Sequence, residues 1–89
     1  MKKILFVCMG NICRSAAAEA VLKKYIADKG LENEYMVDSA GIIGCHVGEP
    51  ADSRMISAAA ERGYNVDSIA RRVSSQDFDR FDCVIAMDN

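Results

Sequence analysis

The sequence predicts an α/β protein built on a three-layer, open parallel sheet: three strands in the order 2-1-3, with helices on both faces. Strand-like runs at residues 3–8, 34–40 and 83–87 alternate with segments of helical periodicity at 14–29 and 52–62. A strand, a helix and a second parallel strand in succession form a right-handed βαβ unit. Ligands of such sheets bind beyond the carboxyl ends of the strands. We therefore expect the functional site after residue 8.

Local sequence patterns also predict where helices begin and end and which residues are buried. Glycines at positions 30 and 63 are expected to end the two long helices. Residues 74–77 are typical of a capped helix start with an acidic first turn, and predict a short helix through residue 81. The run 83–87 predicts a third buried strand, with Cys83 in the core. In the first helix the predicted buried face consists of Ala18, Val21, Leu22, Tyr25 and Ile26.

Length, charge and composition narrow the classes of function. The chain has 89 residues, which predicts a single domain over residues 1–89. The net charge of −2 gives no reason to expect nucleic acid or an anionic membrane surface as a partner. No apolar run reaches the length that crosses a membrane, and we see no targeting segment, so a cytoplasmic protein is expected.

Cysteine usage argues for free thiols. The chain has four cysteines and one histidine, and no Cys-x2-Cys pair occurs. This pattern gives no zinc site, and we expect neither a metal nor another cofactor. A disulfide framework is not expected in a reducing compartment.

A cysteine and an arginine flank the loop that follows the first strand. Cys8 ends the apolar run and Arg14 begins the first helix, with five residues between them. A loop of this length can wrap around a tetrahedral oxyanion with its backbone N–H groups pointing inward, at the positive end of a helix. Arg14 would hold two oxygens of the anion. The same positive surroundings would lower the pKa of Cys8 and make it a thiolate nucleophile.

Neighbouring residues carry further expectations. Gly10 and Asn11 suit backbone with positive φ and a close approach of other groups. Ser15 could donate its hydroxyl to the Cys8 sulfur, could cap the helix, or could do both. The predicted phosphate-binding loop is Met9, Gly10, Asn11, Ile12, Cys13 and Arg14.

The motif at residues 7–15, Val-Cys-Met-Gly-Asn-Ile-Cys-Arg-Ser, resembles that of the low-molecular-weight protein tyrosine phosphatases. Matching segments stand in the family's order at residues 38–41, 46–54, 70–71 and 86–88. The resemblance implies hydrolysis of phosphotyrosine or another aryl phosphate, with phosphate ion as a ligand and no cofactor. Cys8 would attack phosphorus and form a phosphocysteine, Arg14 and the loop amides would stabilise the oxygens, and water would then release phosphate.

The resemblance also implies roles for supporting residues. Asn11 would have its loop conformation held by polar neighbours, and Ser39 would be one of them, although an ordinary turn hydroxyl is an equal alternative for Ser39. Cys13 would trap an oxidised Cys8 as a reversible disulfide, or else fill a small buried space. Ile12 suits a planar aryl ester, whereas the related arginine phosphatases carry Thr at this position.

The general acid is the missing part of this interpretation. The family supplies the acid from an Asp-Pro-Tyr loop, and no Asp-Pro pair occurs in these 89 residues. The sequence thus resembles the N-terminal part of the family, and a C-terminally truncated chain with impaired activity is expected. Asp88 is a weak candidate for the acid. A third strand without a further neighbour would be an open edge, so a homodimer through this strand is also expected.

Two other functions remain open from the sequence. Without an acid, the chain could be a phosphate- or phosphotyrosine-binding module with little turnover. Arsenate reduction uses a similar loop with two further redox cysteines near the third strand. Cys83 comes too early in that strand for such a role, so this alternative ranks last.

Overall fold

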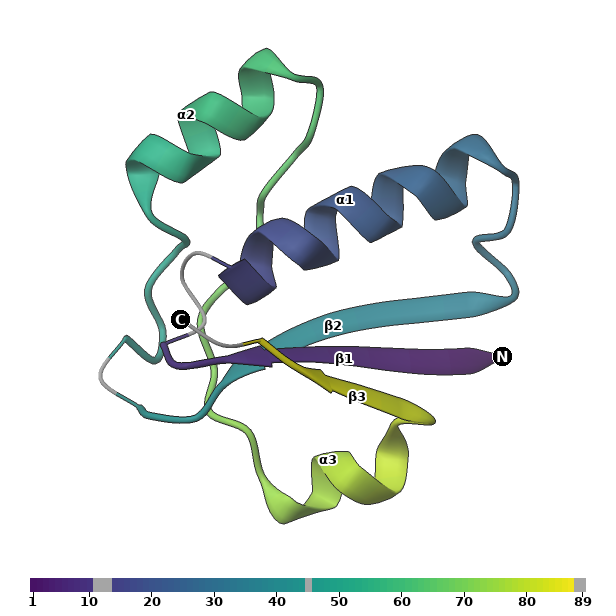
Figure 1. The fold of residues 1–89 in the computed structure, drawn as a ribbon, viewed down its shortest axis with the longest axis vertical. Helices are drawn as coiled ribbons and strands as arrows, with labels where there is room; N and C mark the ends of the chain where they lie inside the picture. The colour runs from purple at the N-terminus through teal and green to yellow at the C-terminus, as the bar shows by residue number, and fades with distance from the viewer. Residues whose placement is uncertain (11–13, 45, 88–89) are drawn as a thin grey trace.

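The computed structural model describes residues 1–10, 14–44 and 46–87. All three strands are parallel and β1 lies between β2 and β3, so the predicted fold class and strand order are confirmed (Figure 1). The helices and strands, in chain order, are β1 (Lys2–Cys8), α1 (Arg14–Asp28), β2 (Tyr35–Gly41), α2 (Ser53–Glu61), α3 (Ser75–Arg80) and β3 (Cys83–Ala86).

The helices cover opposite faces of this sheet. Figure 1 shows α1 and α2 on one side and α3 on the other. One buried cluster lies on the α3 side of the sheet and consists of Leu5, Val7, Ala40 and Phe81. A second cluster joins α1 to α2 and the segment before residue 70, and consists of Ala16, Ala20, Ala51 and Val66. Among the described residues, no helix is long and apolar enough to cross a membrane.

The predicted helix ends are confirmed. After α1, Gly30 has a φ of 70°, and Leu31 donates its backbone N–H to Ile26 across a distance of 2.9 Å, as in a Schellman motif. Gly63 has a φ of 85° just after α2. At the start of α3 the Ser74 amide donates to the Asp77 carboxylate at 2.7 Å, which is one half of a capping box.

The predicted buried face of α1 is confirmed only in part: Ile26 is buried, and Ala18 and Leu22 are half-buried. Val21 and Tyr25 are 45% and 57% exposed, whereas Ser15, Ala16 and Glu19 are buried. The small side chains of Ala16 and Ala20 pack with Ala51 and Val66. The buried polar side chains have hydrogen-bond partners on the sheet, because Ser15 contacts Cys8 of β1 and Glu19 accepts from Ser39 of β2. The exposed apolar side of α1 borders a groove of about 740 Å³, lined by Phe6, Arg14, Ala17, Ala18, Val21, Leu22, Tyr25 and Met87.

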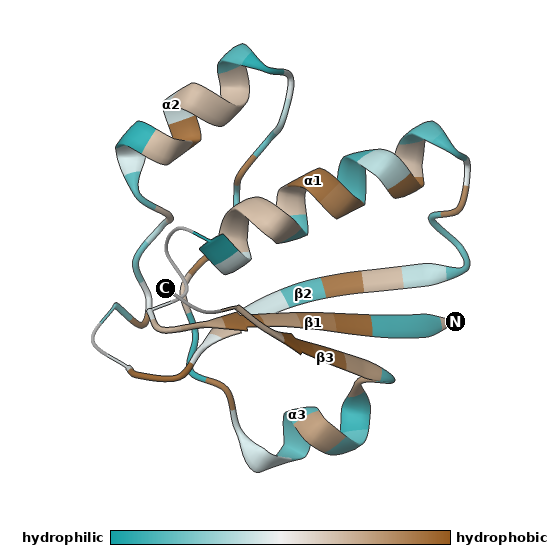
Figure 2. Ribbon diagram, viewed as in Figure 1, coloured by the Kyte–Doolittle hydropathy of each residue, from teal (hydrophilic) through white to brown (hydrophobic). Residues whose placement is uncertain are grey.

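The third strand is not buried as predicted. Figure 2 shows β3 as hydrophobic, yet Cys83, Ile85 and Ala86 are exposed and only Val84 is half-buried. The reason is its position: β3 pairs with β1 along one side and is an edge strand of the described sheet. Cys83 is therefore not a core residue.

Candidate active site

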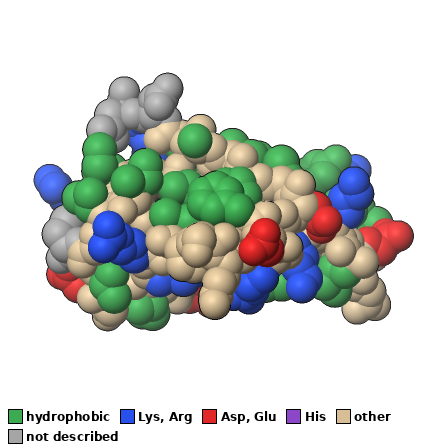
Figure 3. All heavy atoms as spheres, turned by 90° about the horizontal axis from the view of Figure 1, so that it is seen from below, with side chains coloured by type: hydrophobic (Ala, Val, Ile, Leu, Met, Phe, Trp, Pro, Cys, Tyr) green, Lys and Arg blue, Asp and Glu red, His purple; other side chains and the backbone are tan. Residues whose placement is uncertain are grey.

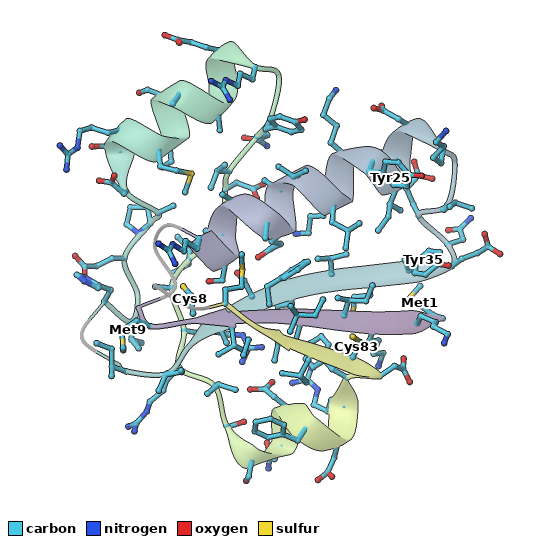
Figure 4. The ribbon with its side chains drawn as sticks, in the orientation of Figure 1. Met1, Cys8, Met9, Tyr25, Tyr35 and Cys83 are labelled. Atoms are coloured by element: carbon cyan, nitrogen blue, oxygen red, sulfur yellow. The ribbon has the colours of Figure 1, made fainter. Side chains whose placement is uncertain are left out.

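The candidate site lies at the carboxyl edge of the sheet. Cys8 is the last residue of the central strand and pairs in register with Gly41 at the end of β2. On the other side, Val7 pairs with Ala86 at the end of β3. Figure 4 shows Cys8 at the end of β1 that lies nearest to the start of α1, with Met9 beyond it. The strand end and the helix start therefore converge on this cysteine, as the sequence predicts.

The structure brings Cys8 and Ser15 together. Cys8 is 5% exposed and Ser15 is fully buried. The Cys8 Sγ and the Ser15 Oγ are 3.0 Å apart, within hydrogen-bond distance for sulfur. A hydroxyl that donates to a sulfur atom stabilises its thiolate form more than its thiol form. The geometry therefore fits the sulfur-contacting role of Ser15.

The structure describes only some of the other predicted site residues. Arg14 is the first residue of α1, is exposed, and borders the groove beside Phe6 and Met87. Met9 is 45% exposed. The predictions for Asn11, Ile12, Cys13 and Asp88 lie outside the described residues.

For Gly10 the predicted positive φ is wrong, whereas the predicted close approach of another group is present. Its φ is not positive, so left-handed backbone is not the reason for a glycine here. A Cβ built on Gly10 would stand 3.0 Å from Cδ2 of His46, closer than side-chain carbons normally approach. The close approach of His46, rather than backbone conformation, accounts for the missing side chain. The His46 ring is itself bonded locally, as its Nδ1 lies 2.8 Å from the Glu49 carboxylate.

Ser39 belongs to a buried polar chain that sequence reasoning missed. Its hydroxyl donates to the Glu19 carboxylate at 2.5 Å, and the other Glu19 oxygen accepts from Lys23 Nζ at 2.5 Å. Glu19 is only 4% exposed, although charged residues are rarely buried unless paired. A signal was available: Ser15, Glu19 and Lys23 recur every four residues and so share one face of α1.

A second polar cluster ties β2 to α3 beneath the site. Arg71 binds both oxygens of Asp77 at 3.1 Å, and its Nη2 lies 3.1 Å from Asp38. Asp77 is 1% exposed. Asp38 also accepts the backbone N–H of Ser39 at 2.8 Å, which connects this cluster to the first.

These contacts shift two pKa values. Hydrogen bonds from Arg71 lower the pKa of Asp77 and outweigh burial, which acts in the opposite direction; the Ser74 amide adds to the lowering. Partial burial acts to lower the pKa of Arg71, but the hydrogen bonds and negative charges of Asp77 and Asp38 outweigh it, and the pKa is raised. Both groups are therefore charged over the whole neutral range.

Cys83 is far from Cys8. The register pairs Cys83 with Ile4, four residues before Cys8 along β1. Figure 4 shows the two cysteines toward opposite ends of the sheet. Within the described ranges, no group of three or more His, Cys, Asp or Glu side chains could hold a metal ion.

The fold and the site define an α/β protein with a buried cysteine at the carboxyl edge of a parallel sheet, in contact with a hydroxyl on the following helix. The sequence model of one family, described as low molecular weight phosphotyrosine protein phosphatase, matches residues 3–89. The chain belongs to this family.

Individual relatives agree with this assignment. The low molecular weight protein-tyrosine-phosphatase YfkJ of Bacillus subtilis is 48% identical over 89 residues, which cover 99% of this chain and 57% of the relative. The human low molecular weight phosphotyrosine protein phosphatase is 41% identical over 87 residues, covering 98% of this chain and 55% of the relative. The chain thus spans a little over half the length of these relatives.

Solved structures share the fold. A protein tyrosine phosphatase from Entamoeba histolytica, with Hepes in the active site, superposes with a TM-score of 0.97 at 56% identity, covering 100% of this chain and 57% of that one. A Drosophila arginine phosphatase superposes with a TM-score of 0.92 at 40% identity, covering 100% of this chain and 55% of that one.

Proposed function

We propose that this chain carries the nucleophile and phosphate-binding loop of a cysteine-dependent phosphatase that hydrolyses phosphotyrosine or other aryl phosphates. The observation that carries the proposal is the buried Cys8 sulfur, 3.0 Å from the Ser15 hydroxyl, at the point where β1 leads into the loop before α1. The family assignment supports the same chemistry.

In the proposed mechanism, the Cys8 thiolate attacks phosphorus in line with the aryl oxygen. The S–P bond forms as the P–O bond breaks, and the departing phenolate takes the electron pair and then a proton. Arg14 and the loop amides stabilise the charge on the other oxygens. Water then cleaves the S–P bond, which releases phosphate and restores the thiolate. The Ser15 hydroxyl stabilises that thiolate each time it forms.

The test is to trap the intermediate. Wild-type protein quenched during turnover of an aryl phosphate should carry one phosphoryl group on Cys8, detected by peptide mass mapping. Cys8→Ser should lose this adduct and turnover but still bind inorganic phosphate, whereas Arg14→Ala should weaken both. Turnover that survives in Cys8→Ser would show that Cys8 is not the nucleophile.

For the substrate class, we propose an aryl ester rather than phosphoarginine. The proposal rests on Ile12, because the related arginine phosphatases carry Thr at the matching position. One similar structure is named as a Drosophila arginine phosphatase, so the two classes need a direct comparison. A higher kcat/KM for phosphotyrosine than for phosphoarginine is expected, and Ile12→Thr should reduce the difference.

Two alternative functions compete with this proposal, and the same assays separate the first of them from it. A binding module would bind phosphate but form no phosphocysteine. Arsenate reduction needs a second thiol near Cys8, and the register places Cys83 roughly 13 Å from it along the sheet, at about 3.3 Å per residue. That separation counts against Cys83 as a redox partner.

We also propose a second copy of the chain as a partner, paired through the open edge of β3. The exposed Cys83, Ile85 and Ala86 of this edge strand support the proposal. The proposed place of action is the cytoplasm, where a thiol nucleophile stays reduced.

A further inference from the structure

The His46 ring rests directly on the backbone of Gly10. A Cβ on Gly10 would come within 3.0 Å of His46 Cδ2 and 3.9 Å of His46 Nε2. Because Gly10 does not have a positive φ, the close approach of His46 is the constraint that the structure shows on a side chain at this position. The only histidine of the chain therefore contacts the second residue after the nucleophile.

His46 is held in place from behind. A carboxylate can only accept a hydrogen bond, so the Nδ1 that lies 2.8 Å from Glu49 Oε2 carries the proton. Glu49 is itself fixed, because its carbonyl accepts the N–H of Ala70 at 2.8 Å. Ala70 is 3% exposed and belongs to the packed interior. The ring orientation is thus set by a chain of contacts that begins in the core.

The same loop is bonded to the residues just before Gly10. Ile42 donates its backbone N–H to the Cys8 carbonyl at 2.8 Å, and Ile43 donates to the Met9 carbonyl at 2.9 Å. Residues 42–43 therefore fix Cys8 and Met9 from the backbone. At Gly10 the corresponding contact comes from a side chain, that of His46.

We propose that His46, oriented by Glu49, is a positioning residue that holds Gly10 in the conformation in which the loop binds phosphate. Glycine has the largest backbone freedom of any residue, and a binding loop that must lose this freedom binds its ligand less tightly. The ring removes that freedom before the ligand arrives. This inference rests on the proposed function, because the loop conformation matters only if the loop binds a phosphoryl group.

The experiment measures affinity for inorganic phosphate and stability in the same proteins. Bound phosphate should slow the alkylation of Cys8 by iodoacetamide, and the dependence of the rate on phosphate concentration would give a dissociation constant. His46→Ala should raise this constant about tenfold, the loss expected for one ordering contact. Its melting temperature should stay unchanged, because His46 lies in an exposed surface loop. Val47→Ala is the matched control: Val47 is 55% exposed in the same loop, and its replacement should alter neither quantity.

Two further sets of variants test the contact itself. Glu49→Gln retains an acceptor for Nδ1 and should bind phosphate like the wild type, whereas Glu49→Ala should behave like His46→Ala. Gly10→Ala should weaken binding because the new methyl group meets the ring. Adding His46→Ala to Gly10→Ala should then recover part of the lost affinity, a reversal that a purely structural surface histidine would not produce.

The outcomes separate the two levels of the proposal. A wild-type protein that neither binds phosphate nor forms phosphocysteine would overturn the proposed function and this inference with it. A wild type that binds phosphate, with His46→Ala and Glu49→Ala binding equally well, would overturn the positioning role alone. Additive losses in Gly10→Ala and His46→Ala would do the same.

Discussion

The sulfur of Cys8 and the hydroxyl of Ser15 lie 3.0 Å apart, and both side chains are withdrawn from solvent. One comes from the end of a strand and the other from the first turn of a helix, so the loop between them must close for the pair to form. A hydroxyl that donates to this sulfur would favour its charged form. We therefore propose Ser15 as a determinant of thiol reactivity as well as part of the helix start.

We expect Ser15→Ala to raise the pKa of the Cys8 thiol by about one unit, since a hydrogen bond to a charged group contributes about 1.5 kcal/mol. The pH dependence of iodoacetamide alkylation, followed at Cys8 by peptide mass, gives this pKa. The exposed Cys83 in the same sample serves as an internal reference for the reagent. An unchanged midpoint at Cys8 would mean that Ser15 acts only on the helix.

Two adjacent lysines test the buried chain around Ser39. Lys23 pairs with the buried Glu19 at 2.5 Å, whereas Lys24 pairs with the exposed Asp28 at 3.9 Å. We expect Lys23→Ala to destabilise the fold by about 1–2 kcal/mol, because it removes a charge-assisted bond from a buried carboxylate. Lys24→Ala should cost less than about 0.5 kcal/mol. Urea unfolding measures both, and equal effects would contradict the role given to Glu19.

Arg71 and Arg72 form a similar matched pair. Arg71 holds the buried Asp77 through two bonds, whereas the exposed Arg72 makes a single bond of 3.3 Å to the Ile42 carbonyl. Arg71→Ala leaves a buried charge without its partner, so we expect a loss of about 3 kcal/mol. Arg72→Ala should lose about 1 kcal/mol or less. Equal losses of unfolding free energy in the two variants would show that the ion pair between Arg71 and Asp77 contributes no more than the Arg72 hydrogen bond.

The ion pair between Arg71 and Asp77 also makes the stability of the fold depend on pH. The pKa of Asp77 is lower in the folded chain than its ordinary value of 3.8, so the folded state binds this proton less readily than the unfolded state does. The associated stability is present above about pH 3.8 and is lost as the pH falls through the lower, folded-state pKa. In Arg71→Ala the loss of unfolding free energy on acidification should be smaller. Urea unfolding between about pH 2 and pH 5, the range in which carboxylates titrate, would measure this difference.

Sequence patterns predicted the architecture well because strands and helix ends depend on local features. The apolar run before Cys8, the glycine at position 30 and the run 74–77 each determine their element through nearby residues. Burial was predicted less well because it depends on contacts between elements that are distant in the sequence. The apolar pattern could not show that Val21 and Tyr25 face outward, nor that a buried Glu19 is matched by Ser39 from another element. Such pairings exist only after β2 lies beside α1.

The edge of β3 predicts self-association. Ile85 of this edge strand is 40% exposed, whereas the 62% exposed Phe78 belongs to α3, on the face of the molecule that Figure 3 shows, and not to the strand edge. An open strand edge pairs readily with another copy. We expect the 89-residue chain to dimerise in sedimentation velocity runs, and Ile85→Lys to shift it toward monomer. Phe78→Lys, on α3, is the control and should change the equilibrium little. A wild type that sediments as a monomer at all concentrations would reject the interface.

The last prediction concerns oxidation. Two cysteines bridge only when their Cα atoms are within about 7 Å, and the register separates Cys83 from Cys8 by roughly 13 Å. Cys13 stands five positions after Cys8, on the same predicted loop. The resemblance to the low molecular weight phosphatases implies that Cys13 is the partner of an oxidised Cys8, so mild peroxide should join Cys8 to Cys13 in the folded protein, and a thiol reductant should restore both. Peptide mapping before and after reduction measures the pairing.

In Cys13→Ser, Cys8 should proceed to the irreversible sulfinic form, whereas Cys83→Ser should behave like the wild type. Recovery of a Cys8–Cys83 peptide from folded protein would show that the sheet opens during oxidation, contrary to the register described above.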